Sequence, residues 1–519
     1  MKNKKIIAYS TLFLILALGF FLRFYNIDNT PPGVYPDEAV NGQDAIRANE
    51  TGAYQWFYPA NQGREGLFMN LIALSFKFLG ISVLTLKLPA IIFGTLTIFG
   101  TYLLTKELFQ KENLALIASF LYATSFWAIN FSRIAFRANL LPCILVFTFY
   151  FMFRAIRTKK FRDFAWGGFI FGAGIHTYIA FRIAPLILII LLGSLILSKK
   201  YFLRDYWKHI LVFVATMFLA AAPMLYTFYA HPEYFESRSD SISILSPTVN
   251  QGHLVETFFR SFSLSLIKYN FYGDQNWRHN YPPYPVLDPL VGIGFIFGFF
   301  YSLTKLVSLF IHRLKNKERD TDLNIHALLM AWFFVMLIPE FMTAESLPHA
   351  LRSIGTLPAV MIIASLVFGY LLEKSKESSK FYQKIVLSIV ITMLLSSGIF
   401  NAIKYNYFWA QKEKVGLSFN KNITDMAKYI NTLPREQEKF VITSYNTIEK
   451  APVDVLTHAH TASFFYPNEL QKLQPTTTDF MIFFTENNRD AMNELQQRFP
   501  NLTLTEVTGT LGSVYYVLK

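Results

Sequence analysis

The sequence predicts a polytopic α-helical membrane protein with a small α/β domain at its carboxyl end. Hydrophobic residues make up 53% of the 519 residues and charged residues only 16%, a balance that a soluble chain of this size does not normally have. Apolar stretches long enough to cross a bilayer recur from Ile6 almost to residue 403. The remaining segment, which runs to Lys519, instead alternates short helical and strand-like patterns.

Hydropathy predicts about eleven crossings of roughly 20 residues each. Their predicted limits are 6–22, 83–104, 114–131, 139–156, 164–181, 183–198, 209–229, 288–311, 325–342, 355–372 and 383–403. The first has Lys2, Lys4 and Lys5 before it and no small-residue cleavage site after it, so we expect a retained anchor.

The basic connectors set the expected orientation. With a cytoplasmic amino terminus, every connector on that side is rich in lysine or arginine, as the positive-inside rule requires; these connectors are 106–111, 154–162, 199–208, 313–319 and 374–384. The non-cytoplasmic side of the plasma (cytoplasmic) membrane then carries the long loops 23–82 and 230–287. We therefore expect a membrane domain over 1–403 and an extracytoplasmic α/β domain over 404–519.

The net charge of +13 is explained by these basic connectors, so we expect no nucleic-acid partner. The only cysteine, Cys143, lies in an apolar run, and a single cysteine allows neither an intrachain disulfide nor a thiolate metal cluster.

Local patterns predict further elements outside the spans. In the first outer loop, Glu38 to Asn49 and Leu67 to Leu79 have amphipathic helical patterns, and we expect both helices to lie in the membrane interface. In the tail we expect two helices and three strands, at Met426 to Leu433, Asp490 to Arg498, Phe440 to Thr443, Phe480 to Phe484 and Ser513 to Val517.

The most distinctive motif is the acidic pair Asp37-Glu38, which follows the first span within Pro-Pro-Gly-Val-Tyr-Pro-Asp-Glu-Ala. An ionisable group at the edge of a membrane usually has a function. Each residue also has a structural interpretation, because Asp37 can cap the following helix and Glu38 can interact with its dipole. We interpret the pair as catalytic.

Further motifs follow the acidic pair: Gly63-Arg64-Glu65-Gly66-Leu67-Phe68, the expected helix from Ala73 to Gly80, and Lys87-Leu88-Pro89. Together with Asp37-Glu38 they resemble a known family, the protein O-mannosyltransferase and lipid A aminoarabinose transferase group of GT-C glycosyltransferases. Two weaker matches are the arginine turn Ser132 to Arg137 and the late loop His349 to Gly355.

This resemblance implies a GT-C-like fold and an inverting transfer of a sugar from a polyprenyl-phosphate carrier, without a nucleotide sugar. The expected partners are that donor, membrane lipids, and an acceptor protein, lipid or glycan on the non-cytoplasmic side. The aminoarabinose transferases have a lysine followed by prolines where this chain has Arg64-Glu65-Gly66. The resemblance therefore specifies neither the sugar nor the acceptor.

The chemistry explains which side chains are wanted. Inversion at an anomeric carbon needs a carboxylate that takes the proton of the acceptor, and a phosphate leaving group needs the charge stabilisation that arginine provides. With Asp37 and Glu38 as catalytic residues, the predicted substrate-binding residues are Arg64, Glu65, Arg133, Arg137, Tyr178, Arg182, His279, His349 and Arg352. We expect at least two of Arg64, Arg133, Arg137 and Arg352 to face the cavity of Asp37.

Structural alternatives exist for most of these residues. Arg64 and Glu65 can form a local salt bridge, arginines at span ends can reach lipid headgroups, and Tyr178 can belong to an aromatic belt. Asp274, Arg278 and His279 share a loop with Trp277 that suits either a sugar platform or a rigid surface loop.

The sequence contains no His-x-x-x-His spacing and no cysteine pair, so we expect no zinc site built by the protein. Asp37 or Glu38 could hold a divalent cation.

Two other functional classes are compatible with many spans. A lipid or sugar transporter would carry charges near the bilayer midplane and broken helices, whereas here the distinctive polar residues gather at one surface. A noncatalytic scaffold or receptor would leave the outer carboxylates and arginines unexplained.

Overall fold

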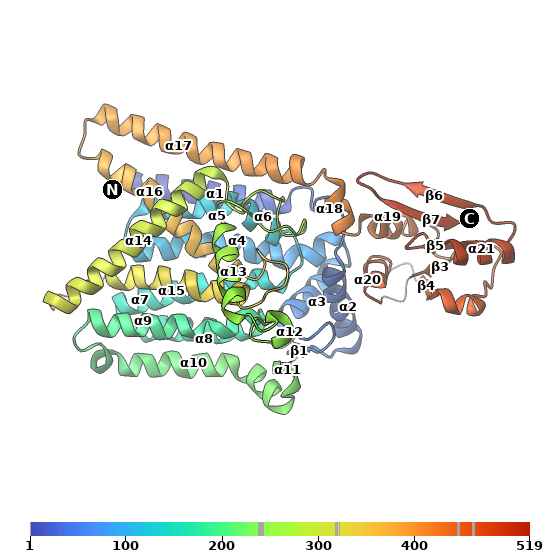
Figure 1. Ribbon diagram of the computed structural model, residues 1–519, viewed down its shortest axis with the longest axis horizontal. Helices are drawn as coiled ribbons and strands as arrows, with labels where there is room; N and C mark the ends of the chain where they lie inside the picture. Colours follow the sequence, from blue (N-terminus) through green and yellow to red (C-terminus); the bar gives the residue numbers. More distant parts are fainter. Residues whose placement is uncertain (1, 237–242, 317–319, 321, 444–446, 459–461) are drawn as a thin grey trace.

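The computed structural model describes residues 2–236, 243–316, 320, 322–443, 447–458 and 462–519. Long helices lie side by side in one bundle, and a small sheet domain projects from one end of it (Figure 1). The bundle helices are α1 (Lys2–Phe24), α4 (Val83–Phe109), α5 (Glu112–Thr124), α6 (Phe126–Ser132), α7 (Leu140–Thr158), α8 (Phe161–Ala173), α9 (Pro185–Ser198), α10 (Phe202–Ala230), α14 (Pro289–Asn316), α15 (Asp322–Phe341), α16 (Leu357–Ser375) and α17 (Lys380–Ile403).

Within the described residues, nine helices are long and apolar enough to cross a membrane, and the pair α5 and α6, bent by 58°, raises the number to ten. By this criterion one of the eleven predicted spans, the fifth, is not counted, because α8 has only 13 residues and is thus about 20 Å long, shorter than a hydrocarbon core of about 30 Å. The chain still passes from one end of the bundle to the other in this segment, since Asp163 pairs with Arg154 of the basic connector and Arg182 lies beside Glu65 at the end that carries Asp37.

The short helix α8 is nevertheless tightly held in the bundle. A Cβ atom added at Gly168 would lie 2.1 Å from the carbonyl oxygen of Phe213, and one added at Gly172 would lie 2.1 Å from that of Met217. Both partners belong to α10, so this small-xxx-small spacing lets the two backbones touch, as in many membrane helix pairs.

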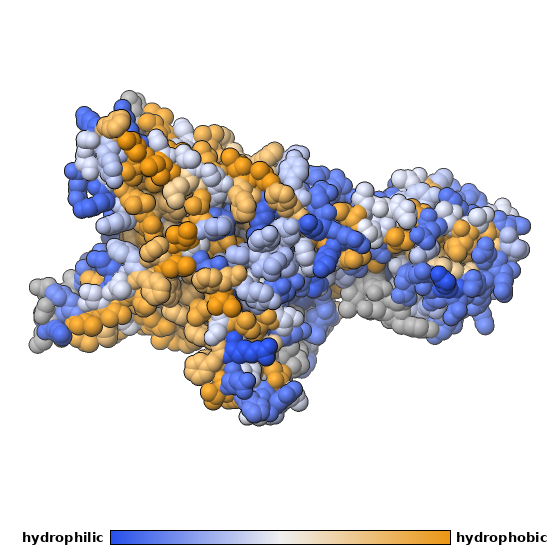
Figure 2. Space-filling view, turned by 45° about the horizontal axis from the view of Figure 1, so that its top comes forward, coloured by the Kyte–Doolittle hydropathy of each residue, from blue (hydrophilic) through white to orange (hydrophobic). Residues whose placement is uncertain are grey.

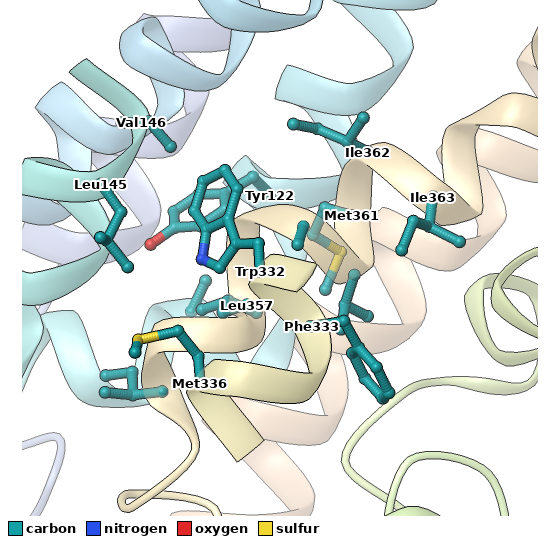
Figure 3. Packing of buried hydrophobic residues seen from close by; sticks show 14 of the residues in the cluster. Tyr122, Leu145, Val146, Trp332, Phe333, Met336, Leu357, Met361, Ile362 and Ile363 are labelled. Atoms are coloured by element: carbon teal, nitrogen blue, oxygen red, sulfur yellow. The ribbon is translucent and has the colours of Figure 1, made fainter. Parts of the chain in front are cut away.

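The interior of the bundle is a continuous apolar core between α5, α7, α15 and α16 (Figure 3). Trp332 lies at its centre and donates its indole N–H to the carbonyl of Gly355 over 2.7 Å. Hydrophobic residues also cover much of the bundle's outer surface, whereas the sheet domain is mainly hydrophilic outside (Figure 2). Side chains such as Phe13, Leu219 and Phe381 are more than two thirds exposed, which suits a surface solvated by lipid.

The first loop forms a compact layer at one end of the bundle. It consists of α2 (Pro36–Thr51), the antiparallel strands β1 (Phe57–Tyr58) and β2 (Arg64–Glu65), and α3 (Leu67–Leu79). Both predicted helices are present. Helix α3 keeps an exposed apolar face that includes Phe78, but the apolar side of α2 is covered by protein, so only α3 has the surface of an interfacial helix.

The second long loop contains α11 (Glu233–Glu236), α12 (Pro247–Asn250) and α13 (Leu254–Ile267). The irregular segment that follows α13 carries Asp274 to Asn280. The third loop of interest, between α15 and α16, ends in the short helix η4 (Ile354–Thr356).

The carboxyl-terminal domain is a five-stranded mixed sheet in the order β4-β3-β5-β7-β6. Strand β3 is parallel to β4 and to the central strand β5, whereas β7 is antiparallel to β5 and β6. The elements are α19 (Lys421–Ile430), β3 (Glu438–Ile442), α20 (Thr447–Leu456), β4 (Ser463–Phe465), η6 (Pro467–Lys472), β5 (Phe480–Phe484), α21 (Arg489–Arg498), β6 (Leu504–Thr508) and β7 (Val514–Leu518). The three predicted strands and two predicted helices are found within a few residues, while α20, β4 and β6 were not predicted.

The bundle and this domain are joined by a mainly helical segment. Helix α17 continues into the π-helix η5 (Lys404–Trp409), and α18 (Glu413–Ser418) follows after a turn at 410–412. Trp409 and Phe419 are fully buried in the core of the bundle, so the independently packed sheet domain begins near Asn420 rather than at residue 404.

The sheet domain rests directly on the first loop. The backbone N–H of Val34 donates to the hydroxyl of Thr424 over 2.9 Å, and the amide of Gln43 donates to the carboxylate of Asp454 over 2.7 Å. The domain and the acidic pair therefore lie at the same end of the bundle.

Candidate active site

Asp37 stands in the first turn of α2, at the junction between this helix and the preceding loop. Pro36 occupies the first helical position, where its fixed φ angle favours a helix start. The Asp37 side chain is partly exposed, and its Oδ1 accepts a hydrogen bond from the amide of Asn61 over 3.0 Å. No ion pair to Asp37 is present among the described residues, which leaves a carboxylate available to a second molecule.

Tyr35 lies beside this carboxylate. Burial and the neighbouring Asp37 raise the pKa of Tyr35 to about 12, and its hydroxyl interacts with both Asp37 and Arg278. The guanidinium of Arg278 lies 4.0 Å from the centre of the Tyr35 ring. The hydroxyl therefore stays protonated at neutral pH and helps to orient the carboxylate.

Glu38 has a different environment from its neighbour. It is fully buried, its Oε2 accepts the backbone N–H of Tyr35 over 3.0 Å, and its Oε1 accepts that of Ala135 over 2.7 Å. The Nζ of Lys87 lies 4.0 Å away. Burial raises the pKa of Glu38, which Lys87 partly opposes.

Both oxygens of Glu38 are thus engaged by the protein. This geometry gives Glu38 a positioning role, in which it fixes the start of α2, in place of the predicted catalytic contact. It also leaves Glu38 poorly placed for the predicted divalent cation.

Arg64 and Glu65 point to opposite sides of strand β2, as neighbours in a strand do. Arg64 is buried, donates to the amide oxygen of Asn41 over 2.7 Å and forms a short ion pair with Asp44. Arg64 therefore does not form the local salt bridge with Glu65 that was the structural alternative. Arg64 fastens the hairpin to α2.

Glu65 joins two arginines from different elements. Its Oε2 accepts from the Nε of Arg137 over 2.7 Å, and its Oε1 lies 4.0 Å from the guanidinium of Arg182. Arg137 in turn lies over the ring of Tyr178, 5.6 Å from its centre. Two cations and one anion leave a positive excess, which suits an anionic ligand.

This positive cluster borders the acidic residue of the loop. The charge of Arg137 and the charge of Asp37 both act on Arg64, so the three groups share one electrostatic environment. The structure therefore brings together Asp37, Arg64, Glu65, Arg137, Tyr178 and Arg182, which the sequence analysis had proposed from separate segments.

Arg133 does not join this group. It is fully buried and donates to the backbone carbonyls of Leu22, Tyr25 and Thr30, each over 2.7 Å. Its guanidinium also lies 5.3 Å from the centre of the Tyr405 ring. Because its donors are used by these carbonyls, Arg133 has a structural role in place of the predicted contact with phosphate.

His279 and His349 form a second group, together with Asp274. The Oδ2 of Asp274 lies 3.0 Å from the Nδ1 of His279 and accepts the N–H of Ala350 over 2.7 Å. The two imidazole rings are 4.7 Å apart. Burial, followed by the nearby charge of His279, lowers the pKa of His349 well below its usual value.

Arg352, the last predicted contact, is held by its own loop. It donates to the hydroxyl of Thr343 over 2.8 Å and to the backbone carbonyl of Glu345 over 2.9 Å, and it forms an ion pair with the Glu345 side chain. Its charge acts on His349, so Arg352 borders the histidine group.

Aromatic rings connect the histidine group to Asp37. The ring of Phe136 is 5.8 Å from that of Tyr35 and 6.5 Å from that of His279. Tyr35 and Asn61 were not among the predicted site residues, because a lone tyrosine and a lone asparagine in a loop carry no spacing signal. The contact between His279 and His349 has no local signal either, because the two residues lie on separate loops.

One segment of the chain is similar to a known protein family. Residues 67–226 match the sequence model of the Dolichyl-phosphate-mannose-protein mannosyltransferase family, a segment that runs from α3 into α10. No curated protein sequence matches the chain in a direct comparison.

The fold is shared with solved structures of low sequence identity. The crystal structure of ArnT from Cupriavidus metallidurans bound to undecaprenyl phosphate has a TM-score of 0.51 at 11% identity, over 97% of both chains. The archaeal oligosaccharyltransferase AglB from Archaeoglobus fulgidus, in complex with an inhibitory peptide and a dolichol-phosphate, has a TM-score of 0.51 at 14% identity, over 88% of this chain and 64% of that chain. The chain thus has the polytopic GT-C fold with a small carboxyl-terminal domain, and the resemblance recognised in the sequence is confirmed.

Proposed function

We propose that this membrane protein is a glycosyltransferase that moves a sugar from a polyprenyl-phosphate carrier to an acceptor on the non-cytoplasmic side, with inversion of the anomeric centre. The observation that carries the proposal is the position of Asp37, a partly exposed carboxylate in the first turn of α2 with no ion pair among the described residues. Asn61 and Tyr35 orient it, and Arg137, a member of the cluster with excess positive charge, acts together with Asp37 on the shared neighbour Arg64.

In this mechanism Asp37 takes the proton of the acceptor hydroxyl or amine. The acceptor atom then forms a bond to the anomeric carbon while the bond from that carbon to the phosphate oxygen breaks on the opposite face. The polyprenyl phosphate leaves with the electron pair and needs no proton, because it is a stable anion at neutral pH.

Arg137 and Arg182 are placed to stabilise this anion. Both are held by Glu65, and their two charges exceed its one, so a phosphate would complete the charge balance. A pair of fixed guanidinium groups in a partly dry site is a strong phosphate ligand.

A lipid-linked donor also agrees with the surface of the molecule. The bundle has an extensive apolar exterior (Figure 2) along which a polyprenyl chain could lie while its phosphate reaches the end that carries Asp37. Of the two fold neighbours, ArnT is bound to undecaprenyl phosphate and AglB is in complex with a dolichol-phosphate.

The proposal is tested by asking whether sugar transfer depends on a lipid-linked donor. The purified protein in detergent or liposomes is given polyprenyl phosphates that carry mannose, other hexoses or aminopentoses, with peptide, lipid and glycan acceptors, and release of polyprenyl phosphate is measured. We expect release that depends on both donor and acceptor and is not supported by nucleotide sugars. Transfer from a nucleotide sugar, or no transfer from any lipid-linked donor across the panel, would contradict the proposal.

A further inference from the structure

The three side chains Asp274, His279 and His349 offer metal-ligand atoms at one point of the structure. One ligand atom from each lies within 4.8 Å of the other two. Asp274 and His279 come from the irregular segment after α13, and His349 comes from the loop between α15 and α16. Two loops that are 70 residues apart thus meet at a set of one carboxylate and two imidazoles.

The spacing suits a small divalent ion. Two ligands on a tetrahedral zinc ion, each about 2.0–2.2 Å from the metal, are about 3.4 Å apart, and Asp274 Oδ2 lies 3.0 Å from His279 Nδ1. Small side-chain rotations would therefore bring the three atoms to coordination distance.

One of the three ligand atoms, on His349, has no partner within the described part of the protein. The Nδ1 of His349 is buried and makes no hydrogen bond, which is costly for a polar atom. The backbone N–H of His349 is held by Glu340 over 2.9 Å, so the residue is anchored in place. A ring nitrogen that no other group of the protein engages is available to coordinate a metal ion.

The surrounding charges leave the site able to accept a cation. Lys268 is neutralised by an ion pair with Glu340 at 2.5 Å, and Arg352 forms an ion pair with Glu345. Arg278 lies over the ring of Tyr35, 4.0 Å from its centre, and its charge also acts on His349. Asp274 is then the carboxylate that faces the two imidazoles.

We propose that Asp274, His279 and His349 bind one divalent metal ion of the zinc class and so fasten the two loops beside Asp37. Carboxylate and imidazole donors favour zinc or a similar transition ion over magnesium or calcium. Three protein ligands leave a fourth position of a tetrahedral ion for water or an anionic oxygen. The proposal is independent of sugar transfer and is tested by metal content.

The experiment uses the full chain in detergent micelles, purified with an affinity tag that contains no histidine. The protein is treated with a chelator, loaded with Zn²⁺ or Co²⁺ alone, separated from free ion and analysed for metal by mass spectrometry. We expect about one ion per chain, and a visible absorption band from Co²⁺ held by nitrogen and oxygen ligands in a site of low coordination number.

Two variants and a matched control sharpen the result. His349→Ala removes the unpartnered nitrogen without breaking a side-chain hydrogen bond, and Asp274→Asn keeps an oxygen for the N–H of Ala350. Each should lower metal affinity at least about tenfold, since even supporting residues of metal sites have effects of this size. His231→Ala, an exposed histidine elsewhere, should leave the affinity unchanged.

Three outcomes would overturn the proposal: a wild-type protein that retains no zinc or cobalt, a His349→Ala variant that retains both as well as wild type, or binding of Mg²⁺ in preference to Zn²⁺. If both variants fail to fold, the stoichiometry and Co²⁺ spectrum of the wild-type protein decide the question on their own.

Discussion

At the scale of single residues, the neighbours Asp37 and Glu38 have the same charge but opposite environments. The Asp37 carboxylate is partly exposed, whereas both carboxylate oxygens of Glu38 accept hydrogen bonds from backbone N–H groups. Arg133 and Arg137 divide in the same way, because Arg133 binds backbone carbonyls and Arg137 pairs with a carboxylate at the edge of the site. Residue type and spacing could not separate the members of either pair.

Asp37→Asn should abolish most of the turnover while the protein still folds. Asparagine preserves the hydrogen bond with Asn61, and the helix start is unaffected because its N-cap is Tyr35, but asparagine cannot take a proton. We expect a loss of about 100-fold or more in turnover, the usual size of general-base catalysis, measured with a polyprenyl-phosphate sugar donor. Asp28→Asn, an exposed acid in the same loop, is the matched control, and near-normal turnover by Asp37→Asn would show that Asp37 is not the catalytic base.

Arg133→Ala should act on stability. It leaves three backbone carbonyls without their donor, and each orphaned buried group costs about 1–3 kcal/mol. We expect a clear fall in the thermal unfolding temperature in detergent, which Arg133→Lys would not restore because a lysine cannot reach three separate acceptors.

Arg137→Ala should act on substrate use instead. Arg182 remains beside Glu65, so folding should be retained, while loss of one charged contact to phosphate is worth about 1.5–3 kcal/mol, or roughly a 10- to 150-fold fall in kcat/KM for the donor. Equal unfolding temperatures for Arg133→Ala and wild type, or unchanged donor kinetics for Arg137→Ala, would contradict this division of roles.

At the scale of elements, the hairpin of β1 and β2 sets the position of the site because it carries Arg64 and Glu65 to opposite sides. Gly66 ends the hairpin, and its N–H donates to the carbonyl of Trp56 over 2.7 Å. A Cβ atom at this position would lie 2.1 Å from the carbonyl oxygen of Gln55. The close contact is with backbone, which cannot rotate away.

Gly66→Ala should therefore displace the hairpin. We expect a cost of about 1–3 kcal/mol or more from overpacking, seen as a lower unfolding temperature together with reduced activity. Gly193→Ala in α9 is the matched control, since an added Cβ there meets no atom within 4 Å, and it should be neutral. Equal behaviour of the two variants would show that the hairpin can move without consequence.

The elements that the sequence predicted well are those with a strong local pattern. Helix α3 was expected at Leu67 to Leu79 and has those limits, and strand β5 likewise matches its expected range. Helix α8 was expected to be longer, because hydropathy extends past Gly174 although the helix ends at Ala173. The histidine group could not be predicted, since it depends on the meeting of two loops and on no local spacing.

At the scale of the whole molecule, the protein is polarised along the bundle. One end carries the first loop, the candidate site and the sheet domain, and the other end carries the connections between α9 and α10 and between α16 and α17 (Figure 1). Hydrogen bonds between the first loop and residues after 420 join the start of the chain to its end. The expected placement of the tail on the side of Asp37 agrees with these contacts.

Cysteine labelling should report this polarity. In a Cys143→Ala background, single cysteines at the exposed positions Asp28 and Lys519 should both react with a membrane-impermeant maleimide in intact cells. A cysteine at Lys376, between α16 and α17 at the opposite end, should react only after permeabilisation. Reaction at only one of the first two positions would be incompatible with the contacts between the loop and the domain.

The contact between Val34 and Thr424 also has a consequence for synthesis of the protein, because its two residues are 390 positions apart. At about 5–20 residues per second, a ribosome needs roughly 20–80 s to make the intervening chain. During that interval Gly42 and the adjacent face of α2 lack their contact with Val455. In the finished protein a methyl group of Val455 lies 3.1 Å from the position that an added Cβ at Gly42 would take. A nascent chain halted before residue 420 would therefore display an uncovered apolar face beside the acidic pair, and this face is where a chaperone or a protease would first meet the unfinished molecule.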